Sequence, residues 1–301
     1  MSCKWLIGLA MAGVLCPLVS PAEAQDEEGK LRIICFGAHP DDCEYQVGGM
    51  AAKWAAAGHK VKFVSTTNGD IGHFRMAGGP LAQRRTAEAQ EAARILGIES
   101  EVLDIHDGEL MPTLENRRTI VRLIRQWKAD VVMSHRPNDY HPDHRYTGVL
   151  VMDSAYMVTV PFFCPDVPAL KRNPVFLYYR DGFQKPNPFR ADVAVSIDDV
   201  WDQKARAMCA LVSQFFEGGV HGSEERVSQI PQTEEARVEY AKTHRGPGHQ
   251  RTADEYRDLL VKLYGPEKGQ AVKYAEVLEI CEYGRRPSED ELKTLFPFFS
   301  Q

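Results

Sequence analysis

The chain has 301 residues, of which 44% are hydrophobic and 26% are charged, and this composition is ordinary for a globular protein. Its 36 lysine and arginine residues stand against 42 acidic ones, which gives a formal net charge of -6. Because the chain has neither a basic run nor an excess of basic residues, nucleic acid is excluded as an expected partner.

The N-terminal segment has the pattern of an export signal. A lysine precedes an apolar stretch from Trp5 to Val19, and Ala22-Glu23-Ala24 supplies the small residues of a cleavage site. A membrane anchor is the alternative, but the stretch is short for a span and contains Pro17. We therefore predict a signal peptide over residues 1–24 and a single domain over residues 25–301. The mature protein would be exported, to the periplasm or the extracellular space, without a stable membrane span.

From residue 31 onward, short apolar runs alternate with amphipathic stretches. The predicted strands are 31–37, 60–66, 101–105 and 130–134, and the predicted helices are 47–57, 81–96, 113–128 and 144–158. Strands that alternate with helices of this length indicate βαβ units. The predicted fold class is therefore α/β, a mostly parallel sheet with helices on both faces.

The pattern is less regular beyond the fourth strand. The predicted elements there are strands at 175–179 and 192–197, a helix at 198–215, loops at 218–230 and 246–248, and short helices at 256–263, 271–280 and 290–295. The chain has no internal repeat, low-complexity segment or clear linker. One domain with an irregular C-terminal portion fits this pattern best.

Two clusters of metal-ligating residue types lie just past predicted strands. Ala38-His39-Pro40-Asp41-Asp42-Cys43-Glu44 follows the first strand, and His141-Pro142-Asp143-His144 follows the fourth. Open α/β sheets bind their ligands at the carboxyl ends of the strands. Together the clusters offer enough imidazoles and carboxylates for a catalytic zinc site with its own general base.

The spacing within the first cluster suggests a role for each residue. His39 and Asp42 lie three residues apart on a turn, so both side chains would face one point, and His144 would complete a three-ligand site. Asp41 would then be the spare carboxylate, which takes a proton from the attacking water and returns it to the leaving group. The same ligands would also accept Fe²⁺ or Co²⁺.

The second cluster adds two further candidates. His141 would donate a hydrogen bond to the oxyanion or protonate the leaving amine, and Asp143 would be its outer partner. Each cluster also has a structural alternative: a His-Pro-Asp turn, a weakly specific His-x-x-His, or a helix cap at Asp41 or Asp42. Their common placement at strand ends favours a functional site.

These motifs resemble those of the PIG-L (LmbE-like) family of zinc-dependent N-acetylglucosamine deacetylases. The resemblance covers residues 31–150 and rests on His39-Pro40-Asp41-Asp42-x-Glu44 together with His141-Pro142-Asp143-His144. It implies a Rossmann-like fold. It also implies that zinc is held by the histidine and second aspartate of the first motif and by the last histidine of the second, with Asp41 as general base and His141 as electrophile or acid.

The resemblance extends to three weaker motifs. Arg85-Thr86-Ala87-Glu88 resembles the family's Arg-x-x-Glu helix, whose arginine touches substrate, so Arg85 is a candidate substrate-binding residue; a solvated Arg–Glu pair is the alternative. Asn68-Gly69-Asp70 resembles the family's loop after the second strand, which makes Asp70 a second candidate. Tyr274-Ala275-Glu276 resembles a C-terminal signature. The sequence departs from the pattern of the mycothiol-precursor deacetylases at Asp139, where those enzymes have a tyrosine.

We therefore predict a hydrolase that removes the N-acetyl group from an N-acetylglucosamine-type amino sugar or glycoconjugate and releases acetate. The predicted export favours an extracellular or envelope glycan as substrate. The alternative is a catalytically inactive carbohydrate- or metal-binding protein of the same fold. A nucleotide-binding Rossmann protein is disfavoured, because no Gly-x-Gly-x-x-Gly follows the first strand.

Overall fold

The computed structural model describes residues 29–299, so the predicted signal peptide and the first residues of the predicted domain lie outside the described residues. Seven strands of the described part form one sheet in the order β3-β2-β1-β4-β5-β7-β6. The strands are β1 (Arg32–Gly37), β2 (Lys60–Ser65), β3 (Glu99–Val102), β4 (Val131–Ser134), β5 (Val175–Tyr179), β6 (Val193–Ser196) and β7 (Ala275–Ile280).

The sheet is mostly parallel, as the sequence predicted. Strand β1 pairs in parallel with β2 and β4, β2 pairs with β3, and β4 pairs with β5. Strand β7 is antiparallel to both of its neighbours, β5 and β6. The chain builds the sheet outward from β1 in one direction and from β4 in the other, so the carboxyl ends of these two strands flank the point at which open α/β sheets bind ligands.

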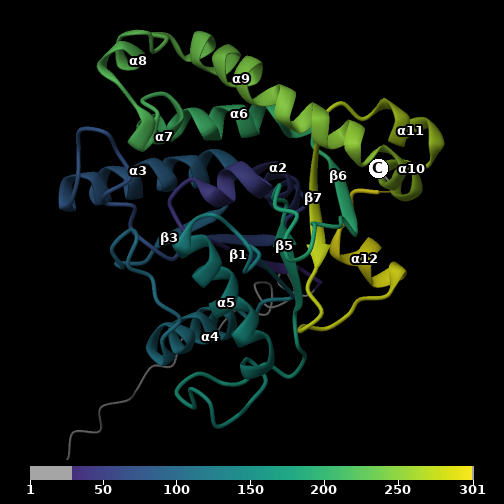
Figure 1. Ribbon diagram of the computed structural model, residues 1–301. Helices are drawn as coiled ribbons and strands as arrows, with labels where there is room; N and C mark the ends of the chain where they lie inside the picture. The colour runs from purple at the N-terminus through teal and green to yellow at the C-terminus, as the bar shows by residue number, and fades with distance from the viewer. Residues whose placement is uncertain (1–28, 300–301) are drawn as a thin grey trace, which may run out of the picture. The chain divides into compact units, whose positions relative to one another are not determined.

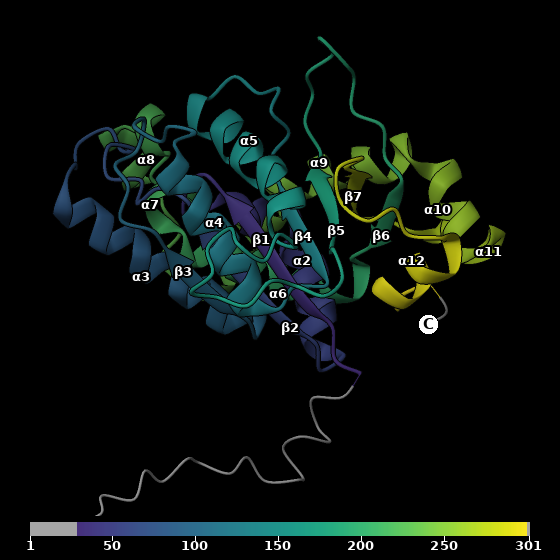
Figure 2. The same cartoon turned by 90° about the horizontal axis from the view of Figure 1, so that it is seen from below.

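Helices cover both faces of this sheet, which confirms the predicted Rossmann-like α/β fold class. The helices are α2 (Asp42–Ala56), α3 (Gly79–Leu96), α4 (Leu114–Trp127), α5 (Pro142–Met157), α6 (Trp201–Ala210), α7 (Val212–Phe215), α8 (Glu224–Ser228), α9 (Glu234–Glu255), α10 (Arg257–Tyr264), α11 (Pro266–Ala271) and α12 (Glu289–Leu295). Helices α2, α3 and α6 lie over one face and α9 packs on α6, whereas α4 and α5 cover the other face (Figure 1, Figure 2). Among residues 29–299, no helix is both long enough and apolar enough to cross a membrane.

Alternate side chains of β1 build the cores on the two faces of the sheet. Ile33 and Cys35 belong to the apolar cluster that includes α2 and α6, whereas Ile34 and Phe36 belong to the cluster that includes α4 and α5. All four side chains are fully buried. A strand that is buried on both faces has a continuous apolar sequence, and this is why the run was recognisable as a strand without any alternation.

Helix α2 begins earlier than predicted and contains a break. The sequence placed its start at residue 47, but the helix begins at Asp42, and the backbone leaves helical geometry at Val47, with φ -138° and ψ 17°. Just after this break, the backbone N–H groups of Gly49 and Met50 donate to the carboxylate of Glu276, over 2.9 and 2.7 Å. A residue of β7 therefore caps the second half of a helix that lies far away in the sequence.

Three predictions for the C-terminal portion are wrong. The helix predicted over 271–280 is instead strand β7, whose hydrogen-bonding partners β5 and β6 no local pattern reveals. The loop predicted over 246–248 lies inside α9, where Gly246 packs on the side chains of Tyr274 and Trp201. The loop predicted over 218–230 contains the 3-10 turn η2 (Gly219–His221) and helix α8. In the first two segments, tertiary packing overrides local propensity.

The helix predicted over 198–215 is also divided. It begins as the 3-10 turn η1 (Asp198–Val200), continues as α6, and is broken at Leu211 before α7. This break matters for the site, because residues on both sides of it line a cavity beside α2.

Candidate active site

The two sequence clusters meet at the carboxyl ends of β1 and β4. The chain leaves β1 at Gly37 and turns so tightly that a Cβ there would lie 2.8 Å from the Cβ of Asp42. Glycine therefore permits the turn that leads into the first cluster. The carboxylate of Asp42 then accepts the backbone N–H groups of Ala38 and His39, over 2.9 and 2.8 Å, which fixes it beside the strand end.

The three predicted metal ligands converge on one point. His39 Nδ1 lies 3.3 Å from His144 Nε2 and 3.6 Å from Asp42 Oδ2, and His144 Nε2 lies 3.6 Å from Asp42 Oδ1. Ligand atoms about 2.1 Å from a tetrahedral zinc ion lie about 3.4 Å from one another. Two imidazoles and a carboxylate are also the ligand types that zinc prefers, so these residues fit the metal that the sequence implied.

Carboxylates hold both imidazoles from behind. His39 Nε2 lies 3.0 Å from Asp107 Oδ1 and 3.4 Å from Asp143 Oδ2, and His144 Nδ1 lies 3.1 Å from Asp139 Oδ1. A carboxylate on the far nitrogen keeps the proton there and directs the lone pair of the near nitrogen toward the other ligands. This is the usual support for a metal-binding histidine.

The pKa shifts follow from this concentration of carboxylates. Burial alone would lower the pKa of His39, but the carboxylates of Asp107, Asp143 and Asp42 raise it well above its ordinary value. Burial alone would raise the pKa of Asp42, but the neighbouring imidazoles, His144 first, lower it well below its usual range. The surroundings thus favour a positive charge at the point where the ligands meet.

Three residues of this site were missed by the sequence analysis. Asp107 follows β3 at the same edge of the sheet, and Asp139 had been noted only as a departure from a family pattern. His135 directly follows β4, and its Nε2 lies 3.2 Å from Asp42 Oδ2. Its ring also stacks on that of His144, with ring centroids 4.1 Å apart. Among residues 29–299, three sets of side chains lie close enough to hold a metal ion: His135 with these two neighbours, His141 with His39 and His144, and His141 with His39, Asp107 and Asp143. The only feature of the sequence that could have indicated His135 is its position directly after a predicted strand.

His141 lies beside the predicted ligands. Its ring meets that of His39 edge-on, with centroids 4.6 Å apart, and its Nδ1 accepts the backbone N–H of Asp143, so it also caps α5. Burial, and then the charges of His39 and His144, lower the pKa of His141. The carboxylate of Asp143 is fully buried and lies against His39 and the backbone N–H of Gly108. Its charge acts on His141 by opposing the lowering of the His141 pKa, and its role as outer partner of His141 stays a prediction.

Asp41 lies beside the ligands and is held by Arg85. Arg85 Nη2 donates to Asp41 Oδ1 over 3.2 Å, and Arg85 Nη1 donates to the carbonyl of Gly69 over 3.1 Å. Burial raises the pKa of Asp41, and the Arg85 charge opposes this shift. The side chain of Asp41 makes no capping hydrogen bond to α2, so the predicted structural alternative for it is not observed.

The surface-pair alternative for Arg85 is wrong. Arg85 is buried, and its neighbour Arg84 makes the ion pair with Glu88, over 3.0 Å. Asp70 is buried as well, and it accepts the backbone N–H of Asp107 and pairs with His106 Nδ1 over 2.6 Å. Substrate contact by Arg85 and Asp70 stays a prediction. In the structure Arg85 contacts Asp41, and Asp70 contacts Asp107, so each supports a residue of the site.

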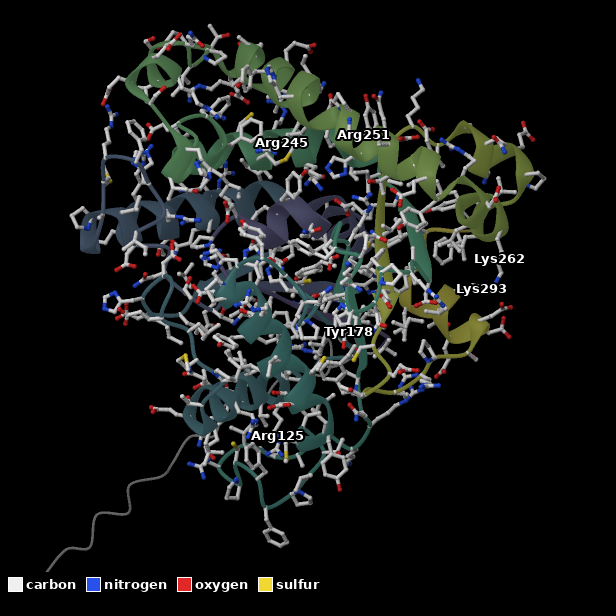
Figure 3. All side chains as sticks on the ribbon, viewed as in Figure 1. Arg125, Tyr178, Arg245, Arg251, Lys262 and Lys293 are labelled. Carbon is white, nitrogen blue, oxygen red and sulfur yellow. The ribbon has the colours of Figure 1, made fainter. Side chains whose placement is uncertain are left out.

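A cavity of about 210 Å³ opens on the site. It is lined by Asp41, Asp42, Tyr45, Met208, Leu211, Gln214, Phe215 and Arg245. Arg245 lies on α9 (Figure 3). Its guanidinium is 5.1 Å from the ring centroids of both Tyr45 and Phe215. The irregular C-terminal portion therefore supplies five of the eight lining residues of the cavity that contains the predicted catalytic residue Asp41.

Comparison with known proteins agrees with this arrangement. The family model described as GlcNAc-PI de-N-acetylase (PIG-L) matches residues 34–155. A diacetylchitobiose deacetylase of Thermococcus kodakarensis is 34% identical over 197 residues, which are 62% of this chain and 71% of that protein. This chain belongs to the PIG-L family. The resemblance that the two motifs indicated is thereby confirmed.

Two other similar proteins extend the comparison. A 4-oxalmesaconate hydratase of Pseudomonas putida is 27% identical over 193 residues, which are 60% of this chain and 73% of that protein. The solved N,N'-diacetylchitobiose deacetylase from Pyrococcus horikoshii has a TM-score of 0.63 at 24% identity, with 86% of this chain and 88% of that chain covered. The second comparison shows a shared fold.

Proposed function

We propose that this PIG-L protein is a zinc-dependent N-deacetylase that acts on an N-acetylglucosamine-type sugar or glycoconjugate. The observation that carries the proposal is the convergence of His39, Asp42 and His144 within 3.6 Å of one another, with the carboxylate of Asp41 beside them. The deacetylase names of two relatives support the same reaction. Fe²⁺ or Co²⁺ would suit the same ligands.

His39, Asp42 and His144 would hold the metal, and a bound zinc ion supplies Lewis acidity to the acetyl carbonyl and to water. Asp41 takes the proton from the attacking water as a general base. It then returns that proton to the nitrogen as the C–N bond breaks, so acetate and a free amine leave. Its raised pKa suits both steps, because a carboxyl group that holds a proton more readily is a better base and still a usable acid.

Arg85 and His141, which neighbour Asp41 and the predicted ligands, would orient the reacting groups. Arg85 fixes the direction of the Asp41 carboxylate through one N–H, while a second hydrogen bond ties it to the loop at Gly69 and a third to the carbonyl of Pro40. His141, whose pKa is lowered, would be neutral near pH 7 and would donate a hydrogen bond to the oxyanion that develops on the acetyl group. We expect His141→Ala to lose most turnover and to keep its metal.

The location of the protein belongs to the same proposal. The N-terminal pattern of a charged residue, an apolar stretch and small residues suits export, and an exported enzyme would meet extracellular or envelope glycans. Cell fractionation tests this step. Mature protein found in the cytoplasm would remove the argument for a glycan outside the cell.

Acetate release from N-acetyl sugars tests the reaction. We expect the purified protein to release acetate and free amine in equal amounts, and Asp41→Asn to lose this turnover while it still binds metal and sugar. Arg118→Met, which removes an exposed charge from α4, is the matched control and should behave like the wild type. If the wild type and Asp41→Asn bind sugar equally and neither releases acetate, the protein is the inactive binding protein of the alternative prediction.

A second candidate is water addition to an unsaturated carboxylate. It is favoured by Arg245, a cation in the cavity at Asp41 and Asp42 that has no ion-pair partner among the described residues, and by the name of the hydratase relative. Hydration of a conjugated acid would lower its ultraviolet absorbance without releasing acetate. Acetate release from a sugar, with no change in the absorbance of such an acid, would exclude it.

A further inference from the structure

A second cavity, of about 160 Å³, shares Tyr45 with the cavity at the candidate active site. Its polar lining comes from α2, from the end of β5, from α9 and from β7, and comprises Tyr45, Gln46, Arg180, His249, Arg251, Thr252 and Glu276. Tyr45 lies three residues after Asp42 on the first turn of α2, so their side chains occupy neighbouring positions on one helix face. A ligand at the metal site would reach the second cavity past Tyr45.

Two residues that line this cavity each carry a buried nitrogen atom that lacks a partner. Arg180 Nε and His249 Nε2 make no hydrogen bond within residues 29–299. The His249 side chain belongs to a residue that is only 8% exposed, so bulk water does not readily satisfy it. Buried polar atoms in proteins are nearly always hydrogen-bonded, and a bare pair that lines one cavity therefore indicates a ligand.

The two nitrogen atoms require different hydrogen-bonding partners. His249 Nδ1 lies 3.4 Å from the carbonyl oxygen of Ala275, which favours the proton on Nδ1. Burial, and then the charge of Lys204, lower the pKa of His249 well below its ordinary value, so the ring is neutral. Its Nε2 is then an acceptor, which a hydroxyl group would satisfy, whereas Arg180 Nε is a donor.

The charges of the cavity leave one cation in excess. Arg180 pairs with Glu255 over 2.6 Å, and Glu276 pairs with Lys204 over 2.5 Å. Arg251 has no ion-pair partner in the described part of the chain, and it lies on α9 beyond Arg245 (Figure 3). The cavity therefore offers a free guanidinium, a buried N–H donor and a buried acceptor.

We propose that this second cavity binds an acidic sugar unit, which carries both hydroxyl groups and an oxyanion and is linked to the N-acetylated sugar at the metal site. The proposal rests on the proposed deacetylase function and names its substrate class. Arg251 and Arg180 receive the carboxylate or phosphate oxygens, and His249 Nε2 accepts from a hydroxyl group. Arg251 would thus be a specificity residue outside the catalytic machinery.

Calorimetric titration of the metal-loaded protein tests the subsite without requiring turnover. The probes are N,N'-diacetylchitobiose, which is neutral; a disaccharide of N-acetylglucosamine and glucuronic acid, which carries a carboxylate; and N-acetylglucosamine 1-phosphate. The variants are Arg251→Met and, as a matched control, Arg118→Met on α4, where an exposed arginine lines neither cavity. Both replacements are at exposed positions and leave the core unchanged.

We expect at least one of the two anionic probes to bind the wild type about tenfold more tightly than diacetylchitobiose, as a charge-assisted hydrogen bond provides. This preference should vanish in Arg251→Met and persist in Arg118→Met, and the probe that shows it identifies carboxylate or phosphate. Equal preference in all three proteins, or none in the wild type, would overturn the proposal. A preference that depends on Arg251, in a protein that deacetylates none of the probes, would retain the subsite and refute the deacetylase function instead.

Discussion

The buried ion pair between Lys204 and Glu276 provides a sharp test of how the site is supported. Both side chains are at most 1% exposed, and the Nζ–Oε1 distance is 2.5 Å. Glu276 also accepts the N–H groups of Gly49 and Met50 after the break in α2. Removal of one partner from a buried pair costs about 3–5 kcal/mol, because the other charge stays buried without compensation.

Lys204→Met should therefore lower the free energy of unfolding by about 3 kcal/mol, the lower end of that range, since two amides still stabilise the carboxylate. Glu276→Ala should lower the free energy of unfolding further. It leaves the buried ammonium group without its carboxylate, and it leaves two backbone N–H groups unsatisfied, each of which costs about 1–3 kcal/mol. Urea denaturation of the purified variants measures both changes in the free energy of unfolding. The double variant should cost clearly less than the sum of the two single variants.

The surface pair of Lys262 and Glu289, with side chains 67% and 78% exposed, is the control, and Lys262→Met should leave stability unchanged within error (Figure 3). A cost below about 1 kcal/mol for Lys204→Met, or strict additivity in the double variant, would refute the reasoning. A link to function is also expected. Lys204 Nζ donates to the carbonyl of Tyr45 over 2.6 Å, so its loss should loosen the turn that carries Asp42 and weaken metal binding.

Three further predictions follow from the site. Asp139→Asn should weaken zinc binding by about 10–100-fold, measured by chelator competition, because it removes the carboxylate behind His144; an unchanged affinity would mean that Asp139 does not orient that ring. Arg85→Met should lower kcat more than it raises KM, because Arg85 holds Asp41 and is buried; a change confined to KM would favour direct substrate contact. The melting temperature should fall as the pH drops below 6.5, because the pKa of His249 is lower in the folded protein and the unfolded chain therefore binds the proton first. His249→Gln should make the melting temperature depend less steeply on pH. Equal pH dependence in the variant and the wild type would contradict this prediction.

The sequence predicted the fold well where local pattern and tertiary placement agree. The strand over 31–37 is buried on both faces, so its apolar run was sufficient. The segment over 271–280 shows the opposite case, because its place between β5 and β6 depends on strands far away in the chain. The Gly-Pro-Gly at 246–248 was predicted as a loop for sound local reasons, yet the close packing of Gly246 on Tyr274 keeps it helical.

The site was predictable to the extent that its residues are adjacent in motifs. His39, Asp42 and His144 were named because the two motifs follow strand ends, and the structure brings them together. Asp107 and His135 carry no motif, and only the return of β3 and β4 to the same edge of the sheet reveals them. Single residues that follow strands deserve inspection whenever a neighbouring strand ends in a metal-binding motif.

Metal analysis of the purified protein tests the central claim most directly. The account predicts about one zinc ion per chain in the wild type and none in His39→Ala or His144→Ala, because the two distant clusters build one site. His244→Ala, at an exposed position on α9, should keep its metal. Zinc that stays bound when His144 is removed would contradict the account, because the two clusters would then not share a metal.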